Sequence, residues 1–262
     1  MMESTTSRRD TGPAVTRDVA VRAEDGVRVS VDHYAGAGRE AACLVCPGFF
    51  QSKDTRTFRD LCLALSRTVD IVAMDFRGHG RSGGLCTFSA REGRDLEAVL
   101  AWAEERYARL GLLGFSLGAA TAIVTAARLA GRVRSLIAVS APASFDDIEF
   151  QWWTPRAWRT GLRGSEPGAG CRPGNPWMRK ARPIDEVKRL KCPALFVHGT
   201  RDAIVGLEHT RRLYAAAPEP KGLSVIEGGD HAEALFRDDP GGFLAISEPW
   251  IARTLAVKAG ES

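Results

Sequence analysis

The stretch that decides the fold is Gly114-Phe115-Ser116-Leu117-Gly118, near the middle of the 262-residue chain. A short apolar run, residues 110–113, comes directly before it, and helix-forming residues 117–130 come directly after it. A G-x-S-x-G sequence between a strand and a helix is typical of a tight turn that strains the serine backbone and projects its hydroxyl above a sheet. We therefore predict that Ser116 is a nucleophile. The alternative is a glycine-rich turn whose serine only caps the helix.

The periodicity on both sides of this turn indicates an α/β fold. Short runs that are apolar on both faces suit parallel strands covered by helices, and helical stretches alternate with these runs. Before them, two alternating stretches flank Asp25-Gly26, which predicts an antiparallel hairpin. We expect a mostly parallel eight-stranded sheet with helices on both faces, built from strands at 18–23, 27–34, 42–46, 71–74, 110–113, 136–139, 194–197 and 223–226 and helices at 57–65, 89–106, 117–130, 207–217 and 242–257.

Residues 141–191 do not follow this alternation of strands and helices. They are rich in proline and glycine, hold four of the six tryptophans and contain no clean strand. Because this segment lies between two core strands, we expect it to form an inserted cap on a core made of residues 17–140 and 192–262. Residues 1–16 are polar and are expected to form a flexible N-terminus.

Composition and charge exclude several classes of function. The chain is 44% hydrophobic and 26% charged, as in an ordinary globular protein. The net charge of +4 is a diffuse excess of 36 basic over 32 acidic residues, so we expect no nucleic-acid binding. No apolar run is long enough for a membrane span or a signal-peptide core, so we expect a cytoplasmic protein with no membrane contact. The sequence does not indicate an oligomeric state.

The six cysteines are expected to be reduced thiols. Cys43 and Cys46 form a C-x-x-C sequence, but they lie in an apolar run and not at a helix N-terminus, where a reactive thiolate would be stabilised. We therefore expect small core residues here, no metal site and no cofactor.

A serine nucleophile needs a base, and the base needs a third group that orients it. Asp202 comes just after the strand at 194–197, and His231 comes just after the strand at 223–226. The carboxyl ends of parallel strands meet at one edge of a sheet, so both should lie beside Ser116. Asp230 is the rival acid, but consecutive side chains in an extended turn point apart. We predict Ser116 as nucleophile, His231 as base and Asp202 as acid.

From about Ala20 to Leu255 the chain resembles the α/β-hydrolase family, and within it the branch of serine esterases, lipases and aminopeptidase-like enzymes with a short cap. The motifs occur in the family's order: Pro47-Gly48-Phe49, Asp75-Phe76-Arg77-Gly78-His79-Gly80-Arg81-Ser82, the serine turn, and the Asp202 and His231 turns. The resemblance implies the α/β-hydrolase fold and the same three catalytic residues. It also implies an oxyanion hole made by the backbone N–H groups of Phe49 and Leu117, the latter at a helix start that favours negative charge.

Two features of the sequence differ from particular groups within this family and argue against membership of those groups. Haloalkane dehalogenases and epoxide hydrolases of this fold carry an aspartate where this chain has Ser116. The sequence Cys46-Pro47-Gly48-Phe49 replaces the His-Gly-Gly-Gly of the hormone-sensitive-lipase-like group.

These observations predict a carboxylesterase-like serine hydrolase that cleaves an ester through an acyl-enzyme. In residues 141–191 ten basic residues face six acidic ones, so an alternative is a thioesterase that acts on coenzyme A or carrier-protein thioesters. An alternative of another class is a non-catalytic ligand-binding protein on the same fold, although all three triad positions are intact.

Aromatic residues near the expected site favour a hydrophobic small-molecule acyl substrate, although the same rings could only pack the cap onto the core. His79 is expected to brace a loop, and His33 and His209 are expected to be solvated. The candidate substrate-binding residues are Phe50, Phe115, Trp152, Trp153, Trp158 and Trp177.

Overall fold

The fold is an eight-stranded sheet whose strands follow the order β1-β2-β4-β3-β5-β6-β7-β8. We describe it from a computed structural model, for residues 12–36, 39–146 and 166–256. Strand β2 pairs antiparallel with β1 and with β4, and every other pair of neighbours is parallel. The expected eight-stranded, mostly parallel α/β sheet is confirmed.

The strands and helices have the following bounds. The strands are β1 Ala14–Arg22, β2 Arg28–Ala35, β3 Ala41–Cys46, β4 Asp70–Met74, β5 Arg109–Phe115, β6 Ser135–Val139, β7 Ala194–Gly199 and β8 Lys221–Ile226. The helices are α1 Arg56–Leu65, α2 Glu92–Glu104, α3 Leu117–Arg128, α5 Pro183–Glu186, α6 Leu207–Ala216, α7 Ala234–Asp238 and α8 Pro240–Leu255, with a 3-10 turn, η1, at Val187–Arg189.

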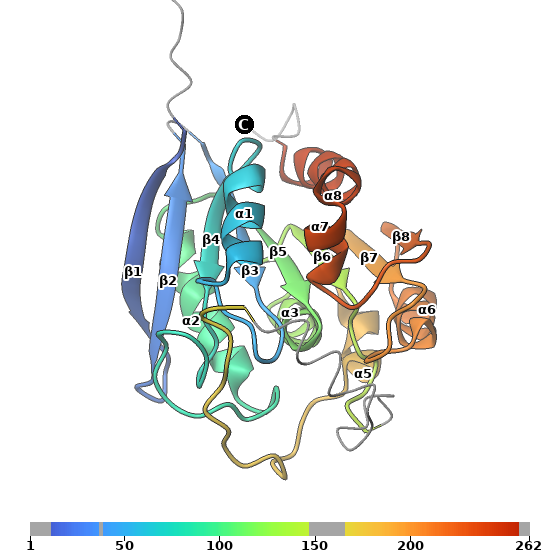
Figure 1. Ribbon diagram of the computed structural model, residues 1–262, viewed down its shortest axis with the longest axis horizontal. Helices are drawn as coiled ribbons and strands as arrows, with labels where there is room; N and C mark the ends of the chain where they lie inside the picture. Colours follow the sequence, from blue (N-terminus) through green and yellow to red (C-terminus); the bar gives the residue numbers. More distant parts are fainter. Residues whose placement is uncertain (1–11, 37–38, 147–165, 257–262) are drawn as a thin grey trace, which may run out of the picture.

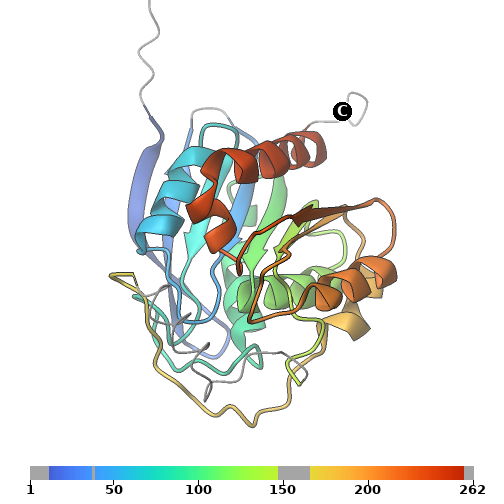
Figure 2. The same ribbon diagram turned by 45° about the vertical axis from the view of Figure 1, so that its right-hand side comes forward.

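Helices cover both faces of the sheet (Figures 1 and 2). Helices α1, α7 and α8 lie on one face, and α2, α3 and α6 lie on the other. Side chains alternate between the faces along each strand, so Leu112 of β5 packs with α2 and α3 while Leu113 packs with α1 and α8. This two-sided burial explains why β5 is apolar at consecutive positions.

The strand and helix predictions fail mainly at short elements and boundaries. Helix α2 begins at Glu92, three residues later than expected, because Phe88 and Ser89 adopt left-handed backbone with φ of 54° and 75°. Helices α5 and α7 were not expected, since four or five residues are too few to show a helical period. Strand β1 begins at Ala14, so regular structure starts inside the segment expected to be flexible.

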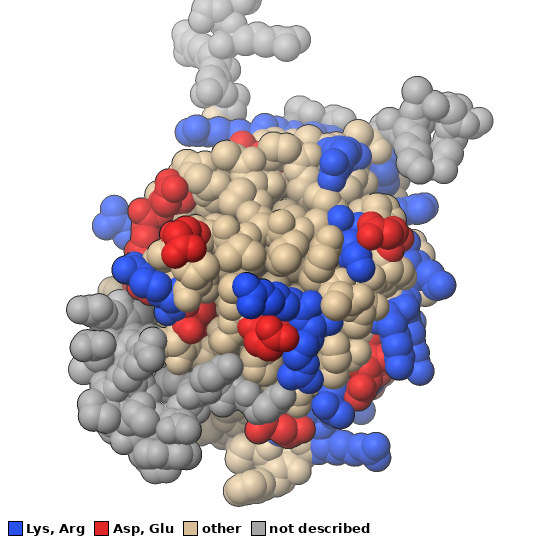
Figure 3. Space-filling view, turned by 90° about the vertical axis from the view of Figure 1, so that its right-hand side faces the viewer, with Lys and Arg blue, Asp and Glu red and all other residues tan. Residues whose placement is uncertain are grey.

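The described part of the expected cap, residues 141–146 and 166–191, adds no strand to the sheet. Its chain crosses the carboxyl edge of the sheet, and Ile184 at its end donates a backbone hydrogen bond to Ala143 O at 3.0 Å. On the molecular face in Figure 3, basic and acidic side chains are interspersed. Among the described residues, no helix combines the length and apolar character needed to cross a membrane.

Candidate active site

Ser116 occupies a strained turn between β5 and α3. Its φ of 50° and ψ of −114° lie in a region that a non-glycine residue rarely adopts, at a cost of about 1–3 kcal/mol. The Ser116 N–H donates to Val139 O at 2.9 Å, which ties the turn to the end of β6. Such strain persists only where the surrounding structure enforces it, and it is often found at functional sites.

The two glycines of the motif are required by close backbone contacts. A Cβ on Gly118 would lie 2.2 Å from Cys46 O and 2.4 Å from Pro47 O. A Cβ on Gly114 would lie 2.6 Å from Ala119 Cα. Only glycine lets helix α3 begin this close to the end of β3.

The structure brings Asp202 and His231 into direct contact. Asp202 follows β7, His231 follows β8, and Asp202 Oδ2 lies 2.7 Å from His231 Nδ1. The other carboxylate oxygen, Oδ1, accepts the backbone N–H groups of Ile204 and Val205, each at 2.9 Å. The Asp202 side chain is fully buried, and the His231 side chain is 12% exposed. The acid is therefore fixed, while the imidazole reaches the surface of the site.

These contacts shift the pKa of both groups toward an ion pair. Burial raises the pKa of Asp202, but the charge and hydrogen bond of His231 outweigh it and hold the pKa below its usual value. Burial lowers the pKa of His231, but the charge and hydrogen bond of Asp202 outweigh it and raise the pKa above its usual value. Asp202 therefore stabilises the protonated imidazole that forms when a base accepts a proton.

His198 is a further contact of Asp202 that the sequence did not reveal. It is fully buried in β7, where Nε2 lies 2.8 Å from Val205 O and 3.3 Å from Asp202 Oδ2. Both neighbours of Nε2 are acceptors, so this nitrogen carries the proton and Nδ1 accepts the hydroxyl of Thr210 at 2.7 Å. Burial lowers the pKa of His198, which keeps the ring neutral. The inward position of this histidine could have been found only from the strand register.

The rival acid, Asp230, faces the opposite way. Its carboxylate is half exposed and lies 3.8 Å from Arg201 Nε. The side chains of Asp230 and His231 thus diverge, as expected for consecutive residues in an extended turn.

Backbone contacts connect the serine turn to the histidine turn through β6. Ser116 N–H donates to Val139 O, the next residue Ser140 donates its N–H to Val197 O at 2.9 Å, and Ala232 N–H donates to Ser140 Oγ at 3.0 Å. Ala232 directly follows His231. Ser116, Asp202 and His231 therefore lie along the carboxyl ends of neighbouring strands.

The loop after β3 lies against the serine turn. A Cβ on Gly48 would lie 3.4 Å from Ser116 Cβ. Phe50 has a φ of 69°, and its N–H donates to His79 Nε2 at 3.2 Å while His79 Nδ1 lies 3.1 Å from Arg77 O. Within the described residues the Phe49 N–H has no acceptor, and Leu117, as the first residue of α3, has no intrahelical acceptor. Two backbone donors are therefore available beside Ser116.

The chain matches the family model described as "Alpha/beta hydrolase family" over residues 43–246. The protein belongs to this family. The human protein named "Serine hydrolase BPHL" is 25% identical over 257 residues, which cover 87% of each chain. The uncharacterized protein YqkD of Bacillus subtilis is 27% identical over 213 residues, which cover 79% of this chain and 70% of YqkD.

Solved structures share the fold of this α/β hydrolase. The esterase Pf2001 of Pyrococcus furiosus superimposes with a TM-score of 0.75 at 20% identity, covering 93% of this chain and 94% of that one. The esterase RhEst1 of Rhodococcus sp. gives a TM-score of 0.73 at 20% identity, covering 91% and 100%.

A second carboxylate stands beside the imidazole in this hydrolase. Glu233 Oε1 accepts a hydrogen bond from Gln51 Nε2 at 2.6 Å, which joins the loop after β3 to the loop after β8. Burial raises the pKa of Glu233, and its charge contributes, after that of Asp202, to the raised pKa of His231. No local pattern in the sequence pairs Gln51 with Glu233, because 182 positions separate them in the chain.

The expected substrate-binding residues differ in how exposed they are. Phe50 is 50% exposed and directly follows Phe49 in the loop after β3. Phe115 is a correction: its ring is fully buried, edge-on to Phe58 and stacked on Phe243, so it has no exposed surface to meet a substrate. Trp177 is 90% exposed and is not enclosed by any described residue. Residues Trp152, Trp153 and Trp158 lie outside the described residues.

Two histidines that were expected to be solvated are buried or partly buried. His209 is 3% exposed and its Nδ1 accepts the Ala143 N–H at 3.0 Å, because this face of α6 lies against the chain that follows β6. His33 is partly buried, and its Nε2 lies 2.5 Å from Tyr107 Oη. His79 does brace its loop, as expected.

The cysteines are free thiols and are almost all buried. Burial raises the pKa of Cys43 to about 12, so its thiol is unreactive. Among the described residues, no group of three or more metal-binding side chains is present.

Proposed function

We propose that this α/β hydrolase cleaves a carboxylic ester through an acyl-enzyme on Ser116. The observation that carries the proposal is the 2.7 Å hydrogen bond between Asp202 and His231 at the sheet edge where the strained Ser116 turn emerges. The family assignment gives the class, hydrolase, and this geometry supports the serine mechanism within it.

In the proposed reaction Ser116 Oγ bonds to the acyl carbon while His231 Nε2 takes the hydroxyl proton. Asp202 holds the Nδ1–H tautomer that leaves Nε2 free to accept it. The bond to the leaving group then breaks, and His231 delivers the proton to the departing oxygen. Water attacks the acyl-enzyme by the same route and releases the acid. The N–H groups of Phe49 and Leu117 stabilise the oxyanion, each worth about a hundred- to a thousandfold in turnover.

Aromatic side chains beside these donors support a hydrophobic acyl group. Phe49 and Phe50 are 39% and 50% exposed, and the Phe49 ring lies 5.1 Å from the ring of Phe88. Such surfaces favour apolar groups, and the proposed reaction uses no metal or cofactor.

Labelling with a fluorophosphonate tests the proposal, because this reagent bonds to an activated serine. We expect the wild type and the control Ser224→Ala, a change on β8, to label, and Ser116→Ala not to label. Hydrolysis of nitrophenyl esters of increasing chain length should be lost in the same variant. Equal labelling of Ser116→Ala would refute the nucleophile. An unlabelled, inactive wild type would favour the non-catalytic binding protein.

A further inference from the structure

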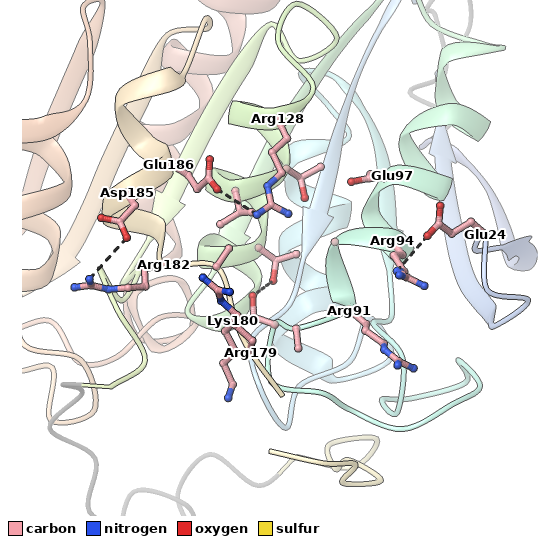
Figure 4. Close-up of a pocket in the computed structure, with 17 residues that line it drawn as sticks. Glu24, Arg91, Arg94, Glu97, Arg128, Arg179, Lys180, Arg182, Asp185 and Glu186 are labelled. Carbon is pink, nitrogen blue, oxygen red and sulfur yellow. Dashed lines mark hydrogen bonds and ion pairs between the residues drawn. The ribbon is translucent and has the colours of Figure 1, made fainter. Parts of the chain in front are cut away.

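A groove lies on the α2 and α3 side of the sheet. It has a volume of about 670 Å³, within the range typical of small-molecule sites. Its walls are the start of α2 and residues 179–186, and its floor is residues 121–128 of α3 (Figure 4). Six of its lining side chains are basic and four are acidic, and the basic ones are Arg91, Arg94, Arg128, Arg179, Lys180 and Arg182.

The cations differ in whether a carboxylate neutralises them. Arg94 pairs with Glu24 at 3.2 Å and Arg128 pairs with Glu186 at 3.1 Å. Arg91, by contrast, makes no ion pair with any described carboxylate.

Two basic residues on the opposite wall also form no ion pair with a described carboxylate. Arg179 has no ion pair in the described part of the chain, and Lys180 Nζ contacts only the backbone carbonyls of Pro176 and Met178, at 2.5 and 3.3 Å. Figure 4 shows Arg91 on one wall and Arg179 and Lys180 on the other, toward the carboxyl ends of the strands. The unneutralised charge is therefore concentrated at the end of the groove nearest the catalytic residues.

One short segment connects this groove to the oxyanion loop. Phe88 packs against Phe49, while the next residue, Ser89, lies 3.1 Å from Thr121 Oγ1 in the groove. Thr121 in turn donates to Leu117 O at 2.9 Å, one helical turn from the nucleophile. With a rise of about 1.5 Å per residue, the floor from Thr121 to Arg128 lies roughly 6–17 Å along α3 from Leu117.

These features suit a long, anionic leaving group and not an acyl chain. An acyl chain needs apolar walls, whereas these walls are charged. Arginine guanidinium groups bind phosphate oxygens in pairs of parallel hydrogen bonds, and two of the three lining cations that form no ion pair with a described residue, Arg91 and Arg179, are arginines.

We infer that this groove binds the phosphates of a thioester's leaving group, of the kind that coenzyme A carries, while the acyl group lies at Ser116. The inference rests on the Ser116 acyl-enzyme of the proposed function and extends its substrates from oxygen esters to thioesters. In this reaction the Ser116 Oγ–C bond forms as the C–S bond breaks, and the proton on His231 goes to the departing sulfur. Water then releases the acid.

The test compares an acyl-coenzyme A with the same acyl group on N-acetylcysteamine, a thioester without phosphate. We expect wild type to show a higher kcat/KM for the coenzyme A substrate, falling with salt. The ratio of the two kcat/KM values should drop by about tenfold or more in Arg91→Glu and in Arg179→Glu, the size of a lost charge-assisted contact. The control Arg67→Glu makes the same charge change beyond α1 and should keep the wild-type ratio.

Both arginines are exposed, so either substitution should leave the fold intact. Free coenzyme A should also inhibit nitrophenyl ester hydrolysis by the wild type and inhibit the two variants less. A ratio of the two kcat/KM values near one in the wild type, or an equal fall of this ratio in Arg67→Glu, would overturn the anion site. The proposed function would still stand if the wild type hydrolysed nitrophenyl esters. Failure to cleave any ester or thioester would overturn both.

Discussion

Replacing Asp202 by asparagine exchanges one carboxylate oxygen for an NH₂ group at the centre of the proposed mechanism. The amide oxygen of Asn can still accept the Ile204 and Val205 N–H groups that Oδ1 accepts now. The NH₂ group then takes the place of Oδ2, 2.7 Å from His231 Nδ1. Because that group only donates, Nδ1 must become the acceptor and the proton moves to Nε2, where the ring can no longer take the serine proton.

The expected loss is about three to four orders of magnitude in kcat, by analogy with a triad aspartate replaced by asparagine. At about 1.36 kcal/mol per tenfold this equals roughly 4–5.5 kcal/mol of the activation free energy. The new NH₂ group would also oppose the His198 N–H, which lies 3.3 Å from Oδ2 in the wild type. Some loss of stability should therefore accompany the loss of activity.

The assay is kcat and kcat/KM for a nitrophenyl ester, with urea unfolding to show that the variant is folded under assay conditions. Asp230→Asn is the matched control, because it makes the same change at a half-exposed side chain directed toward Arg201. We expect this control to stay within a fewfold of wild type. A loss below tenfold in Asp202→Asn with a large loss in Asp230→Asn would refute the assignment of the acid.

Three further changes test other contacts. Glu233→Gln removes a negative charge that raises the pKa of His231, so the acidic limb of the kcat/KM profile should move to lower pH; a shift to higher pH would contradict the geometry. Gly118→Ala places a Cβ about 2.2 Å from Cys46 O, and we expect little folded protein in urea titrations, because overpacking that backbone cannot relieve costs about 3 kcal/mol or more. Arg77→Met leaves Asp95 buried without its partner, which is 2.7 Å away, and should cost about 3–5 kcal/mol in free energy of unfolding; Asp95→Leu added to it should recover part of that loss.

Local patterns in the sequence were sufficient to predict the order of elements and the strained serine turn. Strands such as β5 are apolar at consecutive positions because both faces are covered, and this pattern is visible without any knowledge of the partners. Gly114 and Gly118 mark the turn because the backbone must pass close to its neighbours there. The chain order of Ser116, Asp202 and His231 followed from which strand each residue terminates.

Only the tertiary structure decided which side chains meet. The sequence placed Phe115 near the substrate, but strand register turns its ring into the core between Phe58 and Phe243. It gave no sign that Gln51 would contact Glu233, which lies 182 residues away.

The Ser116 turn shows the same division. The pentapeptide marks the turn in the sequence, but contacts of Gly118 with Cys46 and of Ser116 with Val139, from neighbouring strands, hold its strained backbone. The partners of the serine come from turns that follow β7 and β8, and their separation is fixed by how the strands are ordered and aligned in the sheet. The sequence therefore predicted the serine turn and favoured Asp202 over Asp230, whereas the assembled sheet edge brought Asp202 against the imidazole, because side-chain contacts depend on distant parts of the chain.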